Sequence, residues 1–170
     1  MRKFSKLIFP LAMLLLVAEF STAQNKPLSP KETVEGTVSG VKTKIIYSRP
    51  SARGRKMIGG KEPFGQVWRT GANEATTIEF DKPVKIEGKD LAAGKYALFT
   101  IPGENEWTII FNKTSNQFGA FDYKESDDVL RVKVKPSKTD QFVETFTIST
   151  GNDRINLDWE NTHVAFKVKG

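Results

Sequence analysis

The residues with the greatest capacity for chemistry lie in one stretch, from Arg49 to Glu74. This stretch holds six cations, five glycines and two prolines, and it has no acidic residue before Glu62. The planar guanidinium of arginine matches carboxylate, phosphate or sulfate oxygens two at a time. Glycines let backbone N–H groups approach a ligand closely. We therefore interpret the 49–74 loop as a candidate site for an anion or a glycan.

Seven residues of the 49–74 loop are candidate ligand contacts. The arginines would bind anionic oxygens, Trp68 would stack on a sugar or another flat group, and Asn73 with Glu74 would fix its orientation. The candidates are Arg49, Arg53, Arg55, Trp68, Arg69, Asn73 and Glu74. A structural alternative stays open, in which the arginines pin the loop to acids such as Glu74 or Asp158 and Trp68 fills core.

The amino-acid composition excludes several kinds of catalytic site. The chain has no cysteine and one histidine, His163, which excludes a cysteine nucleophile and a histidine-rich zinc site. We therefore predict no catalytic residue, metal or cofactor, and favour a non-catalytic binding or interaction module. The alternative is a glycan hydrolase that uses Glu74 with a second carboxylate, since glycosidases need two facing acids.

A group of acids also lies in the second long loop, over 112–128. They are Asp122, Glu125, Asp127 and Asp128. Oxygen-rich loops can hold calcium, but this spacing lacks the pattern of a calcium-binding loop. We interpret these residues as a solvated acidic loop.

The N-terminus has the pattern of a signal peptide. Arg2, Lys3 and Lys6 precede an apolar run from Leu7 to Ala18, and small residues before position 24 predict cleavage after Ala23. An uncleaved N-terminal anchor is the alternative. The pattern predicts export to the periplasm or beyond, with no transmembrane segment after cleavage.

The charge balance limits the partners. The whole chain carries +6, and removal of residues 1–23, with three cations and one acid, leaves +4. This mild excess in an exported protein argues against nucleic acid as a partner. We expect an anionic small molecule, a glycan or an envelope protein instead.

The elements that must position these residues are strands. Apolar and polar residues alternate with a period of two through most of the chain, which is typical of half-buried strands. We predict ten: 33–38, 41–48, 75–80, 84–86, 96–101, 107–111, 129–135, 142–149, 154–159 and 162–168. Residues 24–32 read as a flexible lead-in. The pattern predicts a single all-β domain over 33–170, an antiparallel β-sandwich or jelly roll.

Two features of the central strands are specific. The turn Pro102-Gly103-Glu104-Asn105 predicts a hairpin between 96–101 and 107–111. Both alternate sets of residues in 96–101 are largely apolar, so this strand is expected to be covered on both faces.

Several motifs together resemble one bacterial family. They include Tyr47-Ser48-Arg49-Pro50-Ser51, Trp68-Arg69-Thr70-Gly71-Ala72-Asn73, Leu91-Ala92-Ala93-Gly94-Lys95-Tyr96 and Trp159-Glu160-Asn161-Thr162. In this order they resemble the exported proteins grouped as domain of unknown function 2911. The resemblance implies an exported, β-rich domain, and it brings no assigned activity, cofactor or catalytic residue.

Overall fold

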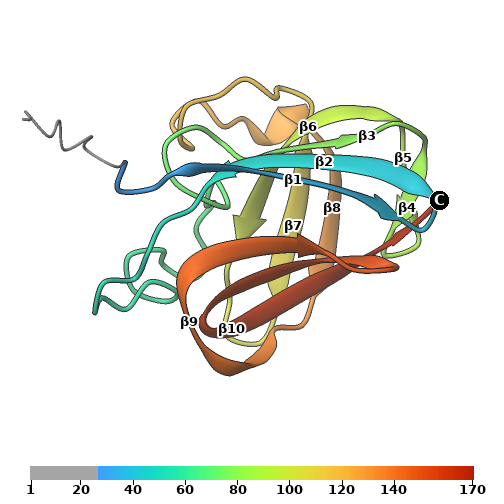
Figure 1. Ribbon diagram of the computed structural model, residues 1–170. Coiled ribbons are helices and arrows are strands. Elements are labelled where there is room, and N and C mark those ends of the chain that lie inside the picture. The colour runs from blue at the N-terminus through green and yellow to red at the C-terminus, as the bar shows by residue number, and fades with distance from the viewer. Residues whose placement is uncertain (1–26) are drawn as a thin grey trace, which may run out of the picture.

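Ten strands of the described chain pair into two antiparallel sheets. One of them, β5 (Lys89–Leu91), is not among the predicted ranges, and two predicted ranges form one strand. The computed structural model describes residues 27–170, so the predicted signal peptide over 1–23 lies outside the described residues. The larger sheet has the order β1-β2-β3-β6-β7-β8 and the smaller has the order β5-β4-β10-β9. In Figure 1 the long strands β9 and β10 cross the lower front of the view, and β1 and β2 cross above them. The arrangement is consistent with the predicted β-sandwich.

The strand bounds are close to the predicted ranges in most places. The larger sheet contains β1 (Lys31–Val38), β2 (Val41–Ser48), β3 (Thr77–Phe80), β6 (Gly94–Ile101), β7 (Trp107–Asn112) and β8 (Asp128–Val134). The smaller contains β4 (Val84–Ile86), β5 (Lys89–Leu91), β9 (Ser137–Thr150) and β10 (Arg154–Lys169). A single 3-10 turn, η1 (Glu125–Asp127), precedes β8. Within residues 27–170, no helix has the length and apolar content needed to cross a membrane.

Tight turns fix the hairpins. Ser39 and Gly40 between β1 and β2 have φ values of 48° and 79°, and Glu87 and Gly88 between β4 and β5 have 47° and 83°. Two consecutive residues with positive φ give the turn whose twist matches that of paired strands. The predicted hairpin of β6 and β7 is also confirmed, with Ile101 opposite Thr108.

The main core fills the space between the sheets. Inward side chains of both sheets meet there, and the largest fully buried ones include Phe80, Phe111, Phe146, Trp159 and Phe166. Alternation along each strand sends these residues inward and their polar neighbours outward. The hydrophobic effect of this burial is the principal force that holds the two sheets together.

A second, smaller core lies on the outer face of the larger sheet. Ala97 and Phe99 of β6 pack there with Ala75 and Ile110, while Leu98 of the same strand faces the main core. Tyr123 and Ala120 from the loop between β7 and β8 cover this cluster, with Val67 from the 49–74 loop. The prediction that β6 is covered on both faces is therefore confirmed, and residues from both long loops contribute to the cover of the outer face.

The C-terminal strand corrects one prediction. Residues 154–159 and 162–168 form one strand, β10, with irregular register between Asp158 and Glu160 and between Glu160 and Thr162. Glu160 has a φ of 53°. This β-bulge shifts the phase of the alternation, so that odd-numbered Trp159 and even-numbered Val164 are both buried. The apparent break in the sequence is a bulge within a continuous strand.

Two other boundaries differ from the predicted ones. The lead-in ends sooner, because β1 begins at Lys31, which pairs with Ser48. The break expected over 136–141 is mostly strand, since β9 begins at Ser137. This part of β9 is an exposed polar edge and carries no alternating pattern, and Phe142, expected to face inward, is 55% exposed.

Candidate functional site

The first arginine of the 49–74 loop is bound to the fold itself. The Arg49 side chain donates to the carbonyl oxygen of Phe146 at 3.3 Å and to Oγ1 of Thr147 at 2.9 Å. Its Nη1 also lies 3.5 Å from the Glu32 carboxylate. Arg49 therefore joins the end of β2 to β1 and β9, which supports the pinning alternative. Its partners are not the predicted Glu74 or Asp158.

Arg53 and Arg55 shape the next part of the loop. Nη2 of Arg53 donates to the carbonyl oxygen of Leu28 at 2.8 Å. Arg55 donates from Nε to the carbonyl oxygen of Ala52 and from Nη2 to that of Ser51, each at 2.9 Å. These guanidinium groups bind backbone oxygens of the chain, and neither shares a hydrogen-bond partner with the Arg49 side chain.

Trp68 does not serve as a stacking surface for a ligand. Its side chain is 2% exposed, and its ring lies 5.6 Å from that of Trp159, with the two rings stacked. Its Nε1 donates to the carbonyl oxygen of Gly71 at 3.0 Å. The prediction of Trp68 as a ligand contact is wrong, because the ring fills the main core and leaves no face open to a sugar.

Arg69 lies near a half-buried acid. Its Nε is buried and donates to no acceptor in the described chain. Burial raises the pKa of the Glu62 carboxyl above its ordinary value, and the positive charge of Arg69 opposes part of that rise. Arg69 is thus an electrostatic neighbour of Glu62 and not the predicted partner of Glu74.

Glu160 is a structural residue that the sequence analysis missed. Its carboxylate accepts hydrogen bonds from the backbone N–H groups of Met57 and Ile58, at 3.0 and 2.8 Å. Both of these residues are buried, so the acid satisfies two donors that water does not reach. The signal in the sequence was the phase change between Trp159 and Val164, which marks the bulge that aims Glu160 at the loop.

The C-terminal end of the 49–74 loop pairs with the loop between β7 and β8. The N–H of Gly119 donates to the carbonyl oxygen of Asn73 at 2.9 Å, and that of Ala75 donates to Gln117 at 3.0 Å. Glu74 and Phe118 form an antiparallel bridge between these segments. We call residues 73–75 and 117–119 the paired loops. Asn73 and Glu74, both exposed, are the two predicted site residues that lie here.

A pocket of about 280 Å³ lies beside the paired loops, on the outer face of the larger sheet. Strands β1, β2, β3 and β6 contribute to its wall together with residues 115–117. Its polar lining includes Lys31, Ser48, Glu74, Lys95, Asn116 and Gln117. Nζ of Lys31 lies 3.7 Å from the Glu74 carboxylate. Of the seven predicted site residues, Glu74 is therefore placed in a pocket wall, together with two lysines that the sequence analysis did not select.

Gln117 is the most deeply buried polar residue of this wall apart from Ser48. Its side chain is 6% exposed, and its Nε2 donates to Oδ1 of Asn112 at 3.1 Å and to the carbonyl oxygen of Thr114. Its Oε1 is buried and accepts no hydrogen bond within the described chain. A buried acceptor without a donor costs about 1–3 kcal/mol.

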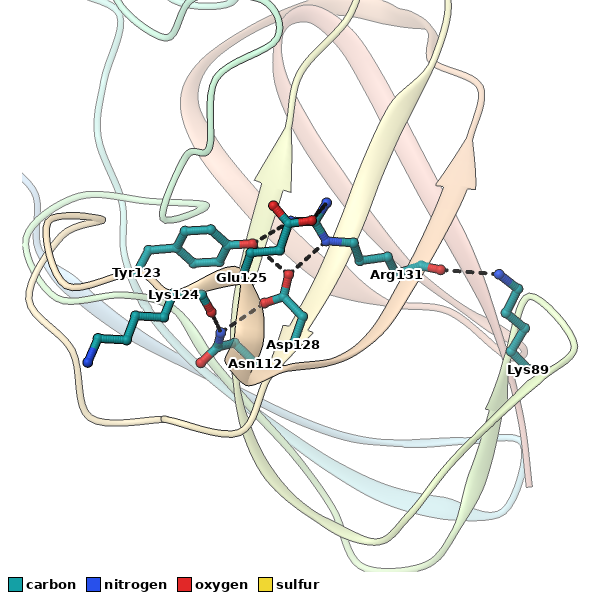
Figure 2. A network of polar contacts seen from close by, with 7 residues as sticks. All are labelled: Lys89, Asn112, Tyr123, Lys124, Glu125, Asp128 and Arg131. Atoms are coloured by element: carbon teal, nitrogen blue, oxygen red, sulfur yellow. Dashed lines mark hydrogen bonds and ion pairs between the residues drawn. The ribbon is translucent and has the colours of Figure 1, made fainter.

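Gln117 donates to Asn112, which belongs to a polar network with Tyr123, Asp128 and Arg131 (Figure 2). Asn112, which accepts from Gln117, donates to Oδ1 of Asp128 at 2.8 Å. Oδ2 of Asp128 accepts from Nε of Arg131 at 2.7 Å and from the hydroxyl of Tyr123 at 2.5 Å. These hydrogen bonds connect Gln117 in the pocket wall to Asp128 and Arg131 of β8, by way of Asn112. These bonds hold the Gln117 side chain in one orientation.

The network also corrects the interpretation of the acidic loop. The Asp128 side chain is almost fully buried between Asn112 and Arg131, and Arg131 in turn contacts Glu125 at 3.1 Å. Asp128 begins β8 and does not lie free in solvent. Within residues 27–170, no three His, Cys, Asp or Glu side chains gather in an arrangement that could hold a metal ion.

The three tyrosines of the chain have raised pKa values, which a pH titration can test. Burial raises the pKa of Tyr47 and Tyr96, and for Tyr123 burial together with the hydrogen bond to Asp128 raises the pKa to about 12. The unfolded chain loses these protons near pH 10. Since the folded state favours the neutral hydroxyl of Tyr123, its contribution to stability is complete below about pH 10 and is lost as the pH rises toward 12.

We expect a native-state titration, followed by the near-ultraviolet absorbance of tyrosinate, to show no full tyrosine ionisation at pH 10. The same protein in concentrated urea should ionise its tyrosines there. Tyr123→Phe should remove the last native transition. Three native transitions all centred near pH 10 would contradict the assignment.

The single histidine lies away from this pocket. His163 is on β10, and its Nδ1 lies 2.6 Å from Oδ1 of Asp158. A separate hollow is lined by this pair and by residues 138–141 and 143 of β9. The histidine therefore adds no group to the pocket beside the paired loops.

Comparison with known families agrees with the motifs in the sequence. A family model described as "Protein of unknown function (DUF2911)" matches residues 29–168, which is most of the chain and nearly all of the described structure. Comparisons with curated proteins and with solved structures gave no significant match. The chain belongs to the family of domain of unknown function 2911.

Proposed function

We propose that this protein is an exported, non-catalytic binding module of the cell envelope. Its ligand is a small anion that carries hydroxyl groups, such as an acidic sugar, and its site is the pocket beside the paired loops. The observation that carries the proposal is the lining of that pocket, in which Lys31, Lys95 and Glu74 border one cavity. Export rests on the signal-peptide pattern of residues 1–23.

The charges of the pocket favour an acidic ligand. Lys31 and Lys95 both line it, and Glu74 is the one carboxylate among the described residues of its wall. Lys31 and Glu74 already contact each other, which leaves Lys95 as an excess positive charge. A carboxylate on the ligand would face the lysines. Hydroxyl groups on the same ligand would donate to Glu74.

The size of the pocket favours a single sugar ring. Pockets for drug-sized ligands span about 300–1,000 Å³, and this one holds about 280 Å³. Apolar side chains of Ile46, Tyr47 and Ala75 complete its wall, which suits the C–H faces of a pyranose. An acidic sugar is both an anion and a glycan unit, and these are the two ligand classes predicted from the composition of the 49–74 loop.

The geometry favours binding over the alternative of a glycan hydrolase. Glycosidases need two carboxyl groups separated by about 5–9.5 Å across the bond that breaks. Glu74 stands without a second carboxylate among the described residues that line its pocket, and it lies beside Lys31. An acid in this setting can orient a sugar hydroxyl but has no partner for acid–base hydrolysis.

Calorimetric titration of the mature chain tests the proposal. The ligands are galacturonic, glucuronic and N-acetylmuramic acid, with glucose and succinate as controls that lack the charge or the hydroxyls. We expect at least one sugar acid to bind at least about tenfold more tightly than either control, because the site satisfies both kinds of group.

A matched pair of variants locates the site. Lys31→Ala with Lys95→Ala should weaken this binding by at least about tenfold. Lys82→Ala with Lys169→Ala removes the same charge from exposed positions outside the pocket and should leave it unchanged. Equal losses in both double variants, or no binding of any sugar acid to the wild type, would overturn the proposal.

A further inference from the structure

Two large aromatic side chains project from the loop that forms the pocket wall. Phe118 is 60% exposed and Phe121 is 86% exposed, whereas Tyr123 of the same loop is packed against Phe99. Gln117, which immediately precedes Phe118, lines the pocket. Exposed aromatic surface that borders a binding pocket is a common mark of an interaction site.

The exposure of these rings does not come from a loosely held loop. The N–H of Gly119 donates a hydrogen bond to the carbonyl oxygen of Asn73, and the ring of Tyr123 lies 5.0 Å from that of Phe99. Figure 2 shows the Tyr123 hydroxyl meeting the side chains of Asp128 and Arg131. The loop thus buries one aromatic residue as its anchor and presents the two others to solvent on a fixed backbone.

The position of Phe118 connects it to the pocket. Phe118 is directly opposite Glu74 in an antiparallel bridge, and side chains of such a pair lie on the same side, about 4.5–5.5 Å apart at Cβ. Glu74 and Gln117 both line the pocket, so Phe118 lies opposite one lining residue and next to another in the chain.

Phe121 lies against a glycine of the same loop. Gly119 has a φ of 65°, and a Cβ placed on it would lie 3.0 Å from two atoms of the Phe121 ring. The ring therefore lies against the backbone at Gly119, one residue from Phe118. We call the two exposed rings of this loop, Phe118 and Phe121, the phenyl platform.

We propose that the protein recognises an acidic polysaccharide strand, with one sugar acid in the pocket and the adjoining sugar on the phenyl platform. This inference rests on the proposed function of the pocket and adds the polymeric nature of the ligand. The pocket has room for about one ring, so a chain must leave it across its rim. The C–H face of a pyranose is apolar and flat, and it matches a phenyl ring in size.

Chain-length dependence of binding tests the inference. Galacturonic acid is compared with tetragalacturonic acid, and glucuronic acid with a hyaluronan tetrasaccharide. We expect at least one tetrasaccharide to bind about tenfold more tightly than its monosaccharide. Phe118→Ala with Phe121→Ala should abolish this preference and leave monosaccharide binding intact. Phe142→Ala, an exposed phenylalanine on β9, is the matched control and should keep the preference.

The possible outcomes separate the two proposals. If the wild type binds a monosaccharide but has no preference for the tetrasaccharide, or if the double variant keeps the preference, the phenyl platform is overturned and the pocket stands. If neither length binds, the pocket itself is overturned. Sedimentation with phosphatidylglycerol vesicles tests whether the two rings bind a lipid surface instead. If the wild type binds vesicles and shows no tetrasaccharide preference, and the Phe118→Ala, Phe121→Ala variant loses vesicle binding, the inference is overturned.

Discussion

Phe166→Ala is expected to destabilise the protein by about 3–5 kcal/mol, the range measured for truncation of a buried phenylalanine. Phe166 on β10 is fully buried, and its ring meets that of Phe111 on β7 edge to face, with 5.8 Å between their centroids. The substitution removes apolar contacts between the two sheets and leaves a cavity that the surrounding strands fill only in part. Urea denaturation followed by tryptophan fluorescence measures the change.

The matched control is Phe121→Ala, which removes the same atoms from a ring that is 86% exposed. It should change the free energy of unfolding by less than about 0.5 kcal/mol, as surface substitutions usually do. A loss below about 1 kcal/mol for Phe166→Ala would mean that the two sheets do not pack at this point as described.

Glu160→Ala is expected to cost about 3–4 kcal/mol, although a glutamate in a strand is ordinarily a surface residue. Its carboxylate accepts from the backbone N–H groups of Met57 and Ile58. Hydrogen bonds to charged groups contribute about 1.5–3 kcal/mol each, and buried donors left without acceptors add a desolvation cost. The substitution should destabilise the 49–74 loop most, since Glu160 links β10 to the middle of that loop.

Two measurements check this expectation. The free energy of unfolding should fall in urea, and trypsin should cleave the native protein faster after Arg53, Arg55 and Lys56, which lie beside the released segment. Glu160→Gln keeps one acceptor oxygen and should lose about half as much stability. Glu35→Ala, which removes an exposed ion pair with Lys44, should cost less than about 1 kcal/mol. A Glu160→Ala protein with wild-type stability and cleavage would contradict the role given to this carboxylate.

The 49–74 loop illustrates which parts of a site can be predicted from sequence. Its concentration of glycines and cations distinguishes it from the strands on either side. The assignment of its arginines as ligand contacts did not follow, since Arg49, Arg53 and Arg55 all donate to backbone oxygens of the chain. Arginine binds a carbonyl oxygen as readily as a ligand oxygen, and only the folded backbone decides which of them is within reach.

The pocket, in contrast, could not be predicted from the sequence. In the sequence Lys31 lies in the predicted lead-in over 24–32, Lys95 lies just before the predicted strand 96–101, and Gln117 is one polar residue in a polar loop. Pairing of β1 with β2, and of β3 with β6, brings the two lysines to one face of the sheet. The paired loops then carry Glu74 and Gln117 to the same place. No local pattern signals a site whose members are separated by tens of residues.

The sequence by itself determined the β-sandwich class and the β6–β7 hairpin, because alternation and turn residues act over a few neighbouring positions. It also determined the family, through motifs spread along the chain, and it led to the expectation of export. Tertiary structure alone decided the burial of Trp68 against Trp159, the pinning of the 49–74 loop by Glu160 and the assembly of the pocket. These features depend on which distant backbone groups meet, and that is settled only when the two sheets and the two long loops pack together.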